Sequence, residues 1–258
     1  MPSRRPALPL WAAVLVAAVG GFVLDLAFPS VGIWPLAYVA VALSLGSLVG
    51  RSAGGALLVG LIFGAAFYFP HISWASSFLG DHPLSWVPWV ALAGVESVFM
   101  GVGAIPIALA IRWSDAWTGR ARMLGAPMLV AGLWTARELV MGSWPYGGFA
   151  WGRIGMSQAE APTAQVASWL GVSGLTFLVV LVSAMALQLV RRLLRARRGE
   201  GRGVRVLSVA PLAVLGAAML LVPQFPTTPV GSITVGDRKS GSAGMPRPRN
   251  VSRMPSSA

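Results

Sequence analysis

Residues 134–158 read WTARELVMGSWPYGGFAWGRIGMSQ, and this stretch joins a hydrophobic helix to a loop rich in Trp and Gly. The helix carries two adjacent ionisable residues, Arg137 and Glu138. A charged side chain in a membrane helix costs roughly 2.5–3.5 kcal/mol on insertion scales, so such residues usually serve a site. We therefore expect a membrane helix that ends close to the membrane surface, followed by a structured loop.

The composition of the whole chain indicates an integral membrane protein. Its 258 residues are 55% hydrophobic and 11% charged, which is outside the range of ordinary soluble domains. Apolar spans occur at about 8–27, 33–49, 53–72, 86–111, 123–141, 164–190 and 204–222, each near the roughly 20 residues that a helix needs to cross a bilayer. Backbone groups in lipid must bond within their own segment, so these spans are predicted to be helices. The predicted fold class is an all-α polytopic bundle of about seven transmembrane helices.

The net charge of +12 is concentrated on alternate connections between the spans. The basic connections contain Arg4, Arg5, Arg51, Arg112, Arg120, Arg122 and the arginines of residues 191–205. The intervening connections hold only Arg153. The positive-inside rule then predicts a cytoplasmic N-terminus and an external C-terminus. The arginine run at 191–205 is interpreted as a topology anchor that touches anionic lipid, and no nucleic-acid partner is expected.

The composition changes at Pro226, where apolar helix gives way to a mixture of Pro, Gly, Ser and Arg. Such a segment buries too little apolar surface to fold, so residues 226–258 are predicted to form a disordered external tail. Within it, residues 231–236 read GSITVG and favour a β-strand, for which the sequence offers no partner strand. The predicted organisation is a transmembrane domain at 1–225 and a tail at 226–258.

The loop after the Arg137–Glu138 helix combines aromatic residues with glycines. Aromatic side chains belong at the headgroup level of a membrane, and glycines permit turns that other residues resist. Glu138 shares a helix face with Trp134, one turn earlier, whereas adjacent helix positions such as Arg137 and Glu138 do not face each other. Arg153 in the loop is therefore the candidate partner of Glu138. The alternative is a plain interfacial aromatic belt, in which an Arg–Glu pair holds two helices together.

The other carboxylates favour structural roles. Asp25 lies by a helix end and Asp115 in a basic connection, whereas Glu96 is deeper in its span. A functional role for Glu96 is weighed against that of a buried, hydrogen-bonded polar group.

Two further patterns carry weak signals. His71, Asp81 and His82 lie on one external connection, but their spacing matches no recognised ligand pattern, so no metal site is expected. Gly60 and Gly64 form a GxxxG pattern, which favours close packing between membrane helices.

Four segments are distinctive in order and spacing. They are LAFPSVGIWPLAYVAVAL (26–43), GLIFGAAFYFPHISW (60–74), the opening stretch at 134–158, and QVASWLGVSGLTFLVVLVSA (165–184). Together they resemble the membrane half of bacterial apolipoprotein N-acyltransferase over about residues 20–190. GSITVG is similar to the first strand of the nitrilase-like domain in that family.

The resemblance implies a multi-pass enzyme of the bacterial plasma membrane, active in lipoprotein maturation. The family transfers a fatty acyl chain from a phospholipid donor to the α-amino group of the N-terminal cysteine of a lipoprotein acceptor. Its Glu-Lys-Cys triad lies in the external nitrilase-like domain, where the Cys forms a thioester. This chain contains no Cys, and its only Lys is Lys239. We therefore expect no catalytic residues, no cofactor and no activity from the chain alone.

The resemblance transfers only the membrane platform. The matching site residues are Trp134, Glu138, Trp144, Pro145, Gly148, Phe149, Trp151 and Gln158, with Arg153 added from the loop. Trp144 and Trp151 are expected to pack against acyl chains, and Glu138 to fix the helix end. The alternative is a non-enzymatic membrane module that binds lipid or docks another envelope enzyme through residues 191–205. A transporter ranks third, because the spans indicate no clean two-fold repeat.

Overall fold

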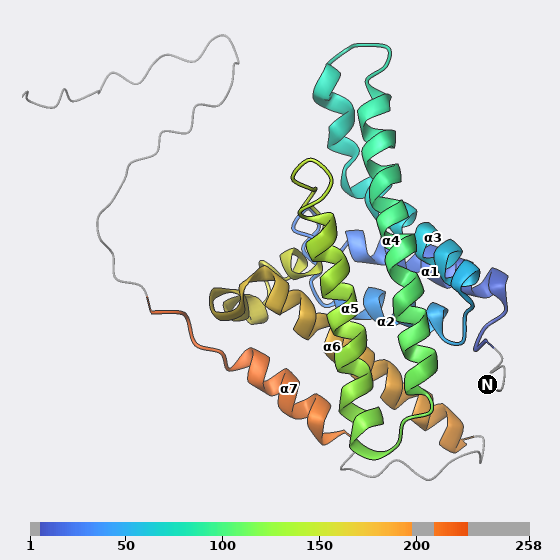
Figure 1. The fold of residues 1–258 in the computed structure, drawn as a ribbon. Helices are drawn as coiled ribbons and strands as arrows, with labels where there is room; N and C mark the ends of the chain where they lie inside the picture. Colours follow the sequence, from blue (N-terminus) through green and yellow to red (C-terminus); the bar gives the residue numbers. More distant parts are fainter. Residues whose placement is uncertain (1–5, 198–208, 227–258) are drawn as a thin grey trace, which may run out of the picture. The chain divides into compact units, whose positions relative to one another are not determined.

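The computed structural model describes residues 6–197 and 209–226, and all regular structure in these two ranges is helical (Figure 1). The α-helices are α1 (Leu10–Asp25), α2 (Leu36–Leu48), α3 (Ala53–His71), α4 (Trp86–Ser114), α5 (Ala126–Met141), α6 (Val166–Arg197) and α7 (Ala210–Leu220). Short helical turns join them: η1 (Ser73–Leu79), η2 (Ala121–Gly125), η3 (Ile154–Gln158) and η4 (Pro162–Gln165). The predicted all-α membrane class is confirmed.

Three helical segments of the described chain are long and apolar enough to cross a membrane: α3, α4 and the continuous stretch Pro162–Arg197 that contains α6. Helices α1, α2 and α7 are apolar but shorter. The seven-span count and the orientation across the membrane therefore stay predictions.

Helix α3 packs closely against α1 and α4, and glycines allow both approaches (Figure 1). A Cβ atom added at Gly64 would lie 2.9 Å from the Ser97 Cα of α4. One added at Gly60 would lie 2.9 Å from the Met100 carbonyl oxygen. These distances are shorter than normal contacts, so the close packing predicted from the GxxxG pattern is confirmed. On the other side of α3, Gly21 of α1 lies against the Phe63 backbone in the same way.

The chain divides into two units, Met1–Phe225 and Pro226–Ala258. The predicted external tail beyond Pro226, its strand at 231–236 and the arginines after position 197 in the 191–205 run lie outside the described residues. The same is true of Arg4 and Arg5 and of the first residues of the span predicted at 204–222.

Candidate functional site

A cavity of about 540 Å³ lies where four parts of the first unit meet. These parts are the connection after α1, the end of α3 with η1, the loop after α5, and the start of α6. The lining is mostly apolar and consists of Phe28, Pro29, Ser30, His71, Trp74, Trp151, Gly152, Gly155, Met156, Gln158, Ala159, Ala164, Ala167, Val172 and Leu175.

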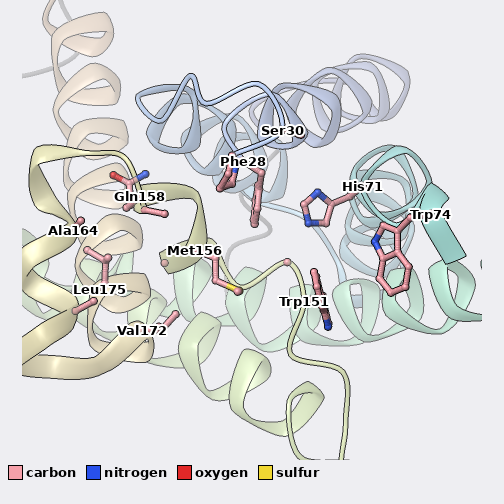
Figure 2. A pocket seen from close by; sticks show the side chains of 15 residues that line it. Phe28, Ser30, His71, Trp74, Trp151, Met156, Gln158, Ala164, Val172 and Leu175 are labelled. Carbon is pink, nitrogen blue, oxygen red and sulfur yellow. The ribbon is translucent and has the colours of Figure 1, made fainter. Parts of the chain in front are cut away.

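The aromatic and aliphatic parts of the lining face each other across this space. Figure 2 shows His71, Trp74 and Trp151 gathered at one side, with Val172 and Leu175 of α6 at the other. The indole rings of Trp74 and Trp151 have centroids 5.3 Å apart, which joins η1 to the loop after α5. The cavity is therefore bounded by side chains from segments far apart in the sequence.

One lining residue, His71, is paired with a carboxylate at the end of α1. His71 Nδ1 is 2.9 Å from Asp25 Oδ1, and both side chains are largely buried. The imidazole is also held between two aromatic rings, stacked on Phe67 with centroids 4.7 Å apart and edge-on to Phe28 at 4.3 Å. Asp25 and His71, which the sequence analysis did not connect with each other, thus form a polar pair beside an apolar space.

The loop over the cavity depends on glycine at two positions. Gly152 has φ +84°, and a Cβ there would lie 2.9 Å from the Tyr68 ring of α3. Gly148 has φ +73°, and a Cβ there would overlap the backbone of Gly142 and Ser143. Both positions combine a left-handed backbone with a close approach that only glycine permits. Gly152 therefore allows the loop after α5 to approach the end of α3, and Gly148 allows it to fold back on the end of α5.

The buried carboxylate of Glu138 holds this loop in place by hydrogen bonds. Glu138 Oε1 accepts hydrogen bonds from Trp134 Nε1 at 3.1 Å and from the Ile154 backbone N–H at 3.2 Å. Its Oε2 accepts from Thr176 Oγ1 of α6 at 2.9 Å, and the same hydroxyl accepts from the Gly155 backbone N–H at 2.9 Å. One carboxylate thus joins α5, η3 and α6 directly beneath the cavity floor.

The prediction that Arg153 is the partner of Glu138 is wrong. Arg137, the adjacent residue, brings its Nη2 atom to 3.5 Å from Glu138 Oε1 because its long side chain folds back over the Trp134 ring, 5.2 Å from the centroid. Within the described residues Arg153 forms no ion pair with Glu138. The Arg153 guanidinium instead lies against Gly142, and its buried Nε has no hydrogen-bond partner.

Glu96 of α4 is also buried, with 2% of its surface exposed. Its Oε2 atom has no hydrogen-bond partner in the described part of the chain. The interpretation of Glu96 as a buried, hydrogen-bonded polar group therefore does not hold for its Oε2 atom.

The structure divides the site residues predicted from the sequence into three sets. Trp151 and Gln158 line the cavity, and Trp134 and Glu138 lie beneath it. Gln158 also fixes the loop, since its Nε2 donates to the Trp34 carbonyl at 3.2 Å and its Oε1 accepts from Thr163 at 3.1 Å. The remaining predicted residues, Trp144, Pro145, Gly148, Phe149 and Arg153, belong to the loop and are absent from the cavity lining.

Two of these loop aromatics still connect to neighbouring elements. Phe149 stacks on Trp151 with centroids 6.5 Å apart, so it supports a cavity residue. Trp144 is 64% exposed and meets Phe99 of α4 edge-on at 6.0 Å. Trp144 therefore lies outside the cavity, on the surface of the bundle.

The sequence interpretation predicted only Trp151 and Gln158 of the cavity wall and missed its other lining residues. Phe28, Ser30, His71 and Trp74 come from the segments FPSVG and PHISW, which served as family markers, and His71 was otherwise considered only as a metal ligand. The available signal was a proline next to Phe28 and Ser30 in the first segment and next to His71 in the second. Nothing in the sequence indicated that both segments would meet the loop after α5.

The comparisons with known proteins point to one family. Residues 20–185 match the sequence model of the apolipoprotein N-acyltransferase N-terminal domain. Proteins named apolipoprotein N-acyltransferase are 28% identical over 231 residues in Geobacter metallireducens and 31% identical over 227 residues in Azotobacter vinelandii. These alignments cover 86% and 85% of this chain, but 41% and 39% of the relatives. A relative of the same name from Mycolicibacterium smegmatis is 39% identical over 104 residues, which are 39% of this chain and 16% of that protein.

The matched region contains every residue that lines the cavity, from Phe28 to Leu175, and the carboxylate beneath it. The chain spans about two-fifths of the length of the first two relatives. This chain therefore belongs to the apolipoprotein N-acyltransferase family and corresponds to its N-terminal membrane half.

Proposed function

We propose that this chain is the lipid-binding membrane domain of an apolipoprotein N-acyltransferase, and that its cavity holds a fatty acyl chain of the phospholipid donor. In the family reaction, that acyl chain passes to the α-amino group of the N-terminal cysteine of a lipoprotein acceptor. The observation that carries the proposal is the apolar cavity of about 540 Å³. Ligand pockets typically measure about 300–1,000 Å³ and have apolar and aromatic walls with few polar groups.

The few polar groups of the wall suit the polar end of a lipid. Ser30 contributes a hydroxyl, and His71 an imidazole that is oriented by its bond to Asp25. Trp74 and Trp151 contribute aromatic surface that packs well against methylene groups. The acyl chain lies among the side chains of α6 and η3, and its ester group lies towards Ser30 and His71.

The proposal includes a position in the cell. The family supports a multi-pass protein of the bacterial plasma membrane, and the positive-inside pattern supports an orientation with the arginine-rich connections in the cytoplasm. The cavity then opens at the outer leaflet, next to the loop after α5. Residues 1–225 form the membrane domain, which carries the cavity.

The chain binds lipid without transferring it. Its 258 residues include no Cys, so the thioester step has no nucleophile within this sequence. The purified chain, free of any full-length relative, is expected to give no N-acylated lipoprotein peptide. Detection of acyl transfer by that preparation contradicts this part of the proposal.

Cavity filling tests the lipid site. Ala167 lines the cavity, so Ala167→Phe places a ring where the acyl chain lies. We expect this variant to bind a phospholipid with a radiolabelled acyl chain about tenfold more weakly, because overpacking an occupied apolar space is destabilising. The matched control is Ala91→Phe, which adds the same ring on an exposed position of α4. Equal binding by both variants and the parent chain contradicts the assignment of the cavity.

A further inference from the structure

A second group of ionisable side chains lies at the end of the bundle remote from the cavity. Helix α5 starts after η2 at this end, and its last residue precedes the loop that covers the cavity. Its 16 residues span about 24 Å at the usual rise per residue. The end of α4, the turn η2 and the end of α6 converge at this remote position.

The pocket between these elements is lined by four arginines and one carboxylate. Its lining residues are Ser114, Asp115, Arg122, Gln188, Arg191, Arg192 and Arg195. Asp115 Oδ1 is 3.2 Å from Arg122 Nη2, and its Oδ2 is 3.5 Å from Arg191 Nη2. Asp115 thereby orders two of the guanidinium groups. Arg192 and Arg195 form no hydrogen bond or ion pair within the described residues.

Like charges crowd this pocket. Burial lowers the pKa of the Arg122 guanidinium, and the neighbouring Arg195, Arg191 and Arg192 lower it further, whereas Asp115 raises it. Among the described lining residues, positive groups exceed negative groups by three. Such an excess next to a membrane is stabilised by an anion. Guanidinium groups bind phosphate oxygens through two parallel hydrogen bonds, so a phosphate group fits this set of donors.

The surroundings of the pocket indicate that the phosphate belongs to a lipid. Trp113 of α4 is 62% exposed, and Leu193 and Leu194 of α6 are 43% and 49% exposed beside the arginines. A small apolar crevice of about 30 Å³ also adjoins Arg191 between α2, α4, α5 and α6, and its other lining residues are Leu45, Ile111, Ala126, Pro127, Val130, Ala184, Leu187 and Gln188. A phospholipid matches the arginines through its phosphate and the surrounding apolar surface through its tails. Free phosphate matches only the arginines.

We propose that Arg122, Arg191, Arg192 and Arg195 form a binding site for the phosphate of an anionic phospholipid on the membrane face opposite the cavity. Basic pockets between membrane helices are known to bind such headgroups. The site is separate from the acyl-donor cavity and goes beyond the proposed function. Arg191, Arg192 and Arg195 also lie beyond residues 20–185, the region that matches the family.

The test is a lipid titration of the purified full chain, measured by native mass spectrometry. Phosphatidylglycerol is the anionic probe and phosphatidylethanolamine the zwitterionic one. The variant Arg192→Gln/Arg195→Gln removes two charges but leaves both ion pairs of Asp115 in place. We expect the parent chain to prefer phosphatidylglycerol, and the variant to bind it about 20-fold more weakly. Inorganic phosphate at millimolar concentration is expected not to displace the lipid.

The matched control is Arg120→Gln/Arg197→Gln. These two arginines lie near the same end of the bundle, are exposed, and do not line the pocket. The control loses the same charge and is expected to bind phosphatidylglycerol within about threefold of the parent chain. An equal loss in both double variants assigns the effect to diffuse surface charge and overturns the site. Displacement by inorganic phosphate overturns the lipid assignment, and absence of any preference between the two lipids overturns both. Circular dichroism with thermal unfolding verifies that each variant is folded.

Discussion

At the scale of single residues, Glu138 connects the sequence to the site. Its bond to Trp134 follows from the four-residue spacing on one helix, and the sequence predicted that they share a face. Its other partners, Ile154 and Thr176, are 16 and 38 residues away, so no local pattern could indicate them. The ion pair with Arg137 was missed because rules for helix faces describe Cβ positions and not the reach of a long, flexible side chain.

The substitution Glu138→Ala tests this residue. It leaves Arg137 as a buried charge without its carboxylate, together with unpaired donors on Trp134 and Thr176. Breaking a buried pair in this way typically lowers the free energy of unfolding by about 3–5 kcal/mol. We also expect the Ile154 amide to exchange its hydrogen faster, since it loses its acceptor.

Hydrogen exchange with mass spectrometry measures this effect, and Glu160→Ala is the control. Glu160 is an exposed carboxylate two residues after the end of η3, so its loss leaves the Glu138 bonds in place. Unchanged exchange at residues 154–158 in Glu138→Ala would show that Glu138 does not fix the loop.

At the scale of the elements, hydrophobic span lengths predicted most helices well. The span expected at 53–72 is α3, Ala53–His71, and the span expected at 86–111 is α4, Trp86–Ser114. The thickness of the membrane sets the length of a spanning helix, so such a helix can be recognised from a short stretch of apolar sequence. The pairing of Asp25 with His71 depends instead on how α1 packs against α3. The hydropathy pattern of the sequence carries no information about that packing. The cavity was unpredictable for the same reason, since four segments that are far apart in the sequence pack together to enclose it.

The α3–α4 contact gives a prediction at this scale. A methyl group at Gly64 would lie 2.8 Å from the Met100 Cβ and 2.9 Å from the Ser97 Cα, so the two helices must separate. We expect Gly64→Ala to lower the free energy of unfolding by about 1–3 kcal/mol, the usual range for overpacking.

Gly54→Ala is the matched control on the same helix. A Cβ at Gly54 meets nothing within 4 Å, so this variant keeps the packing and gains up to about 1 kcal/mol from helix propensity. Unfolding in detergent, followed by circular dichroism, compares the two. Equal stability of the two variants would mean that α3 and α4 do not rely on this close approach.

At the scale of the whole described bundle, two pockets of different character lie towards opposite ends of α5. The cavity end is apolar, with His71, the partner of Asp25, in its wall, and the other end is rich in arginine. Charge counting along the sequence predicted basic connections but could not reveal that η2 and α6 bring their arginines to one pocket. The family match covers the cavity in full. The acyl-donor cavity is therefore the central claim.

Photo-crosslinking tests that claim most directly. The full chain is reconstituted into nanodiscs with a phosphatidylethanolamine that carries a diazirine near the end of one acyl chain, and labelled peptides are identified by mass spectrometry. We predict that labels concentrate in residues 151–159 and 164–175, which line the cavity, and that Ala167→Phe removes them while Ala91→Phe does not. Labels spread evenly over the exposed helix surfaces, with no change in Ala167→Phe, would contradict the account.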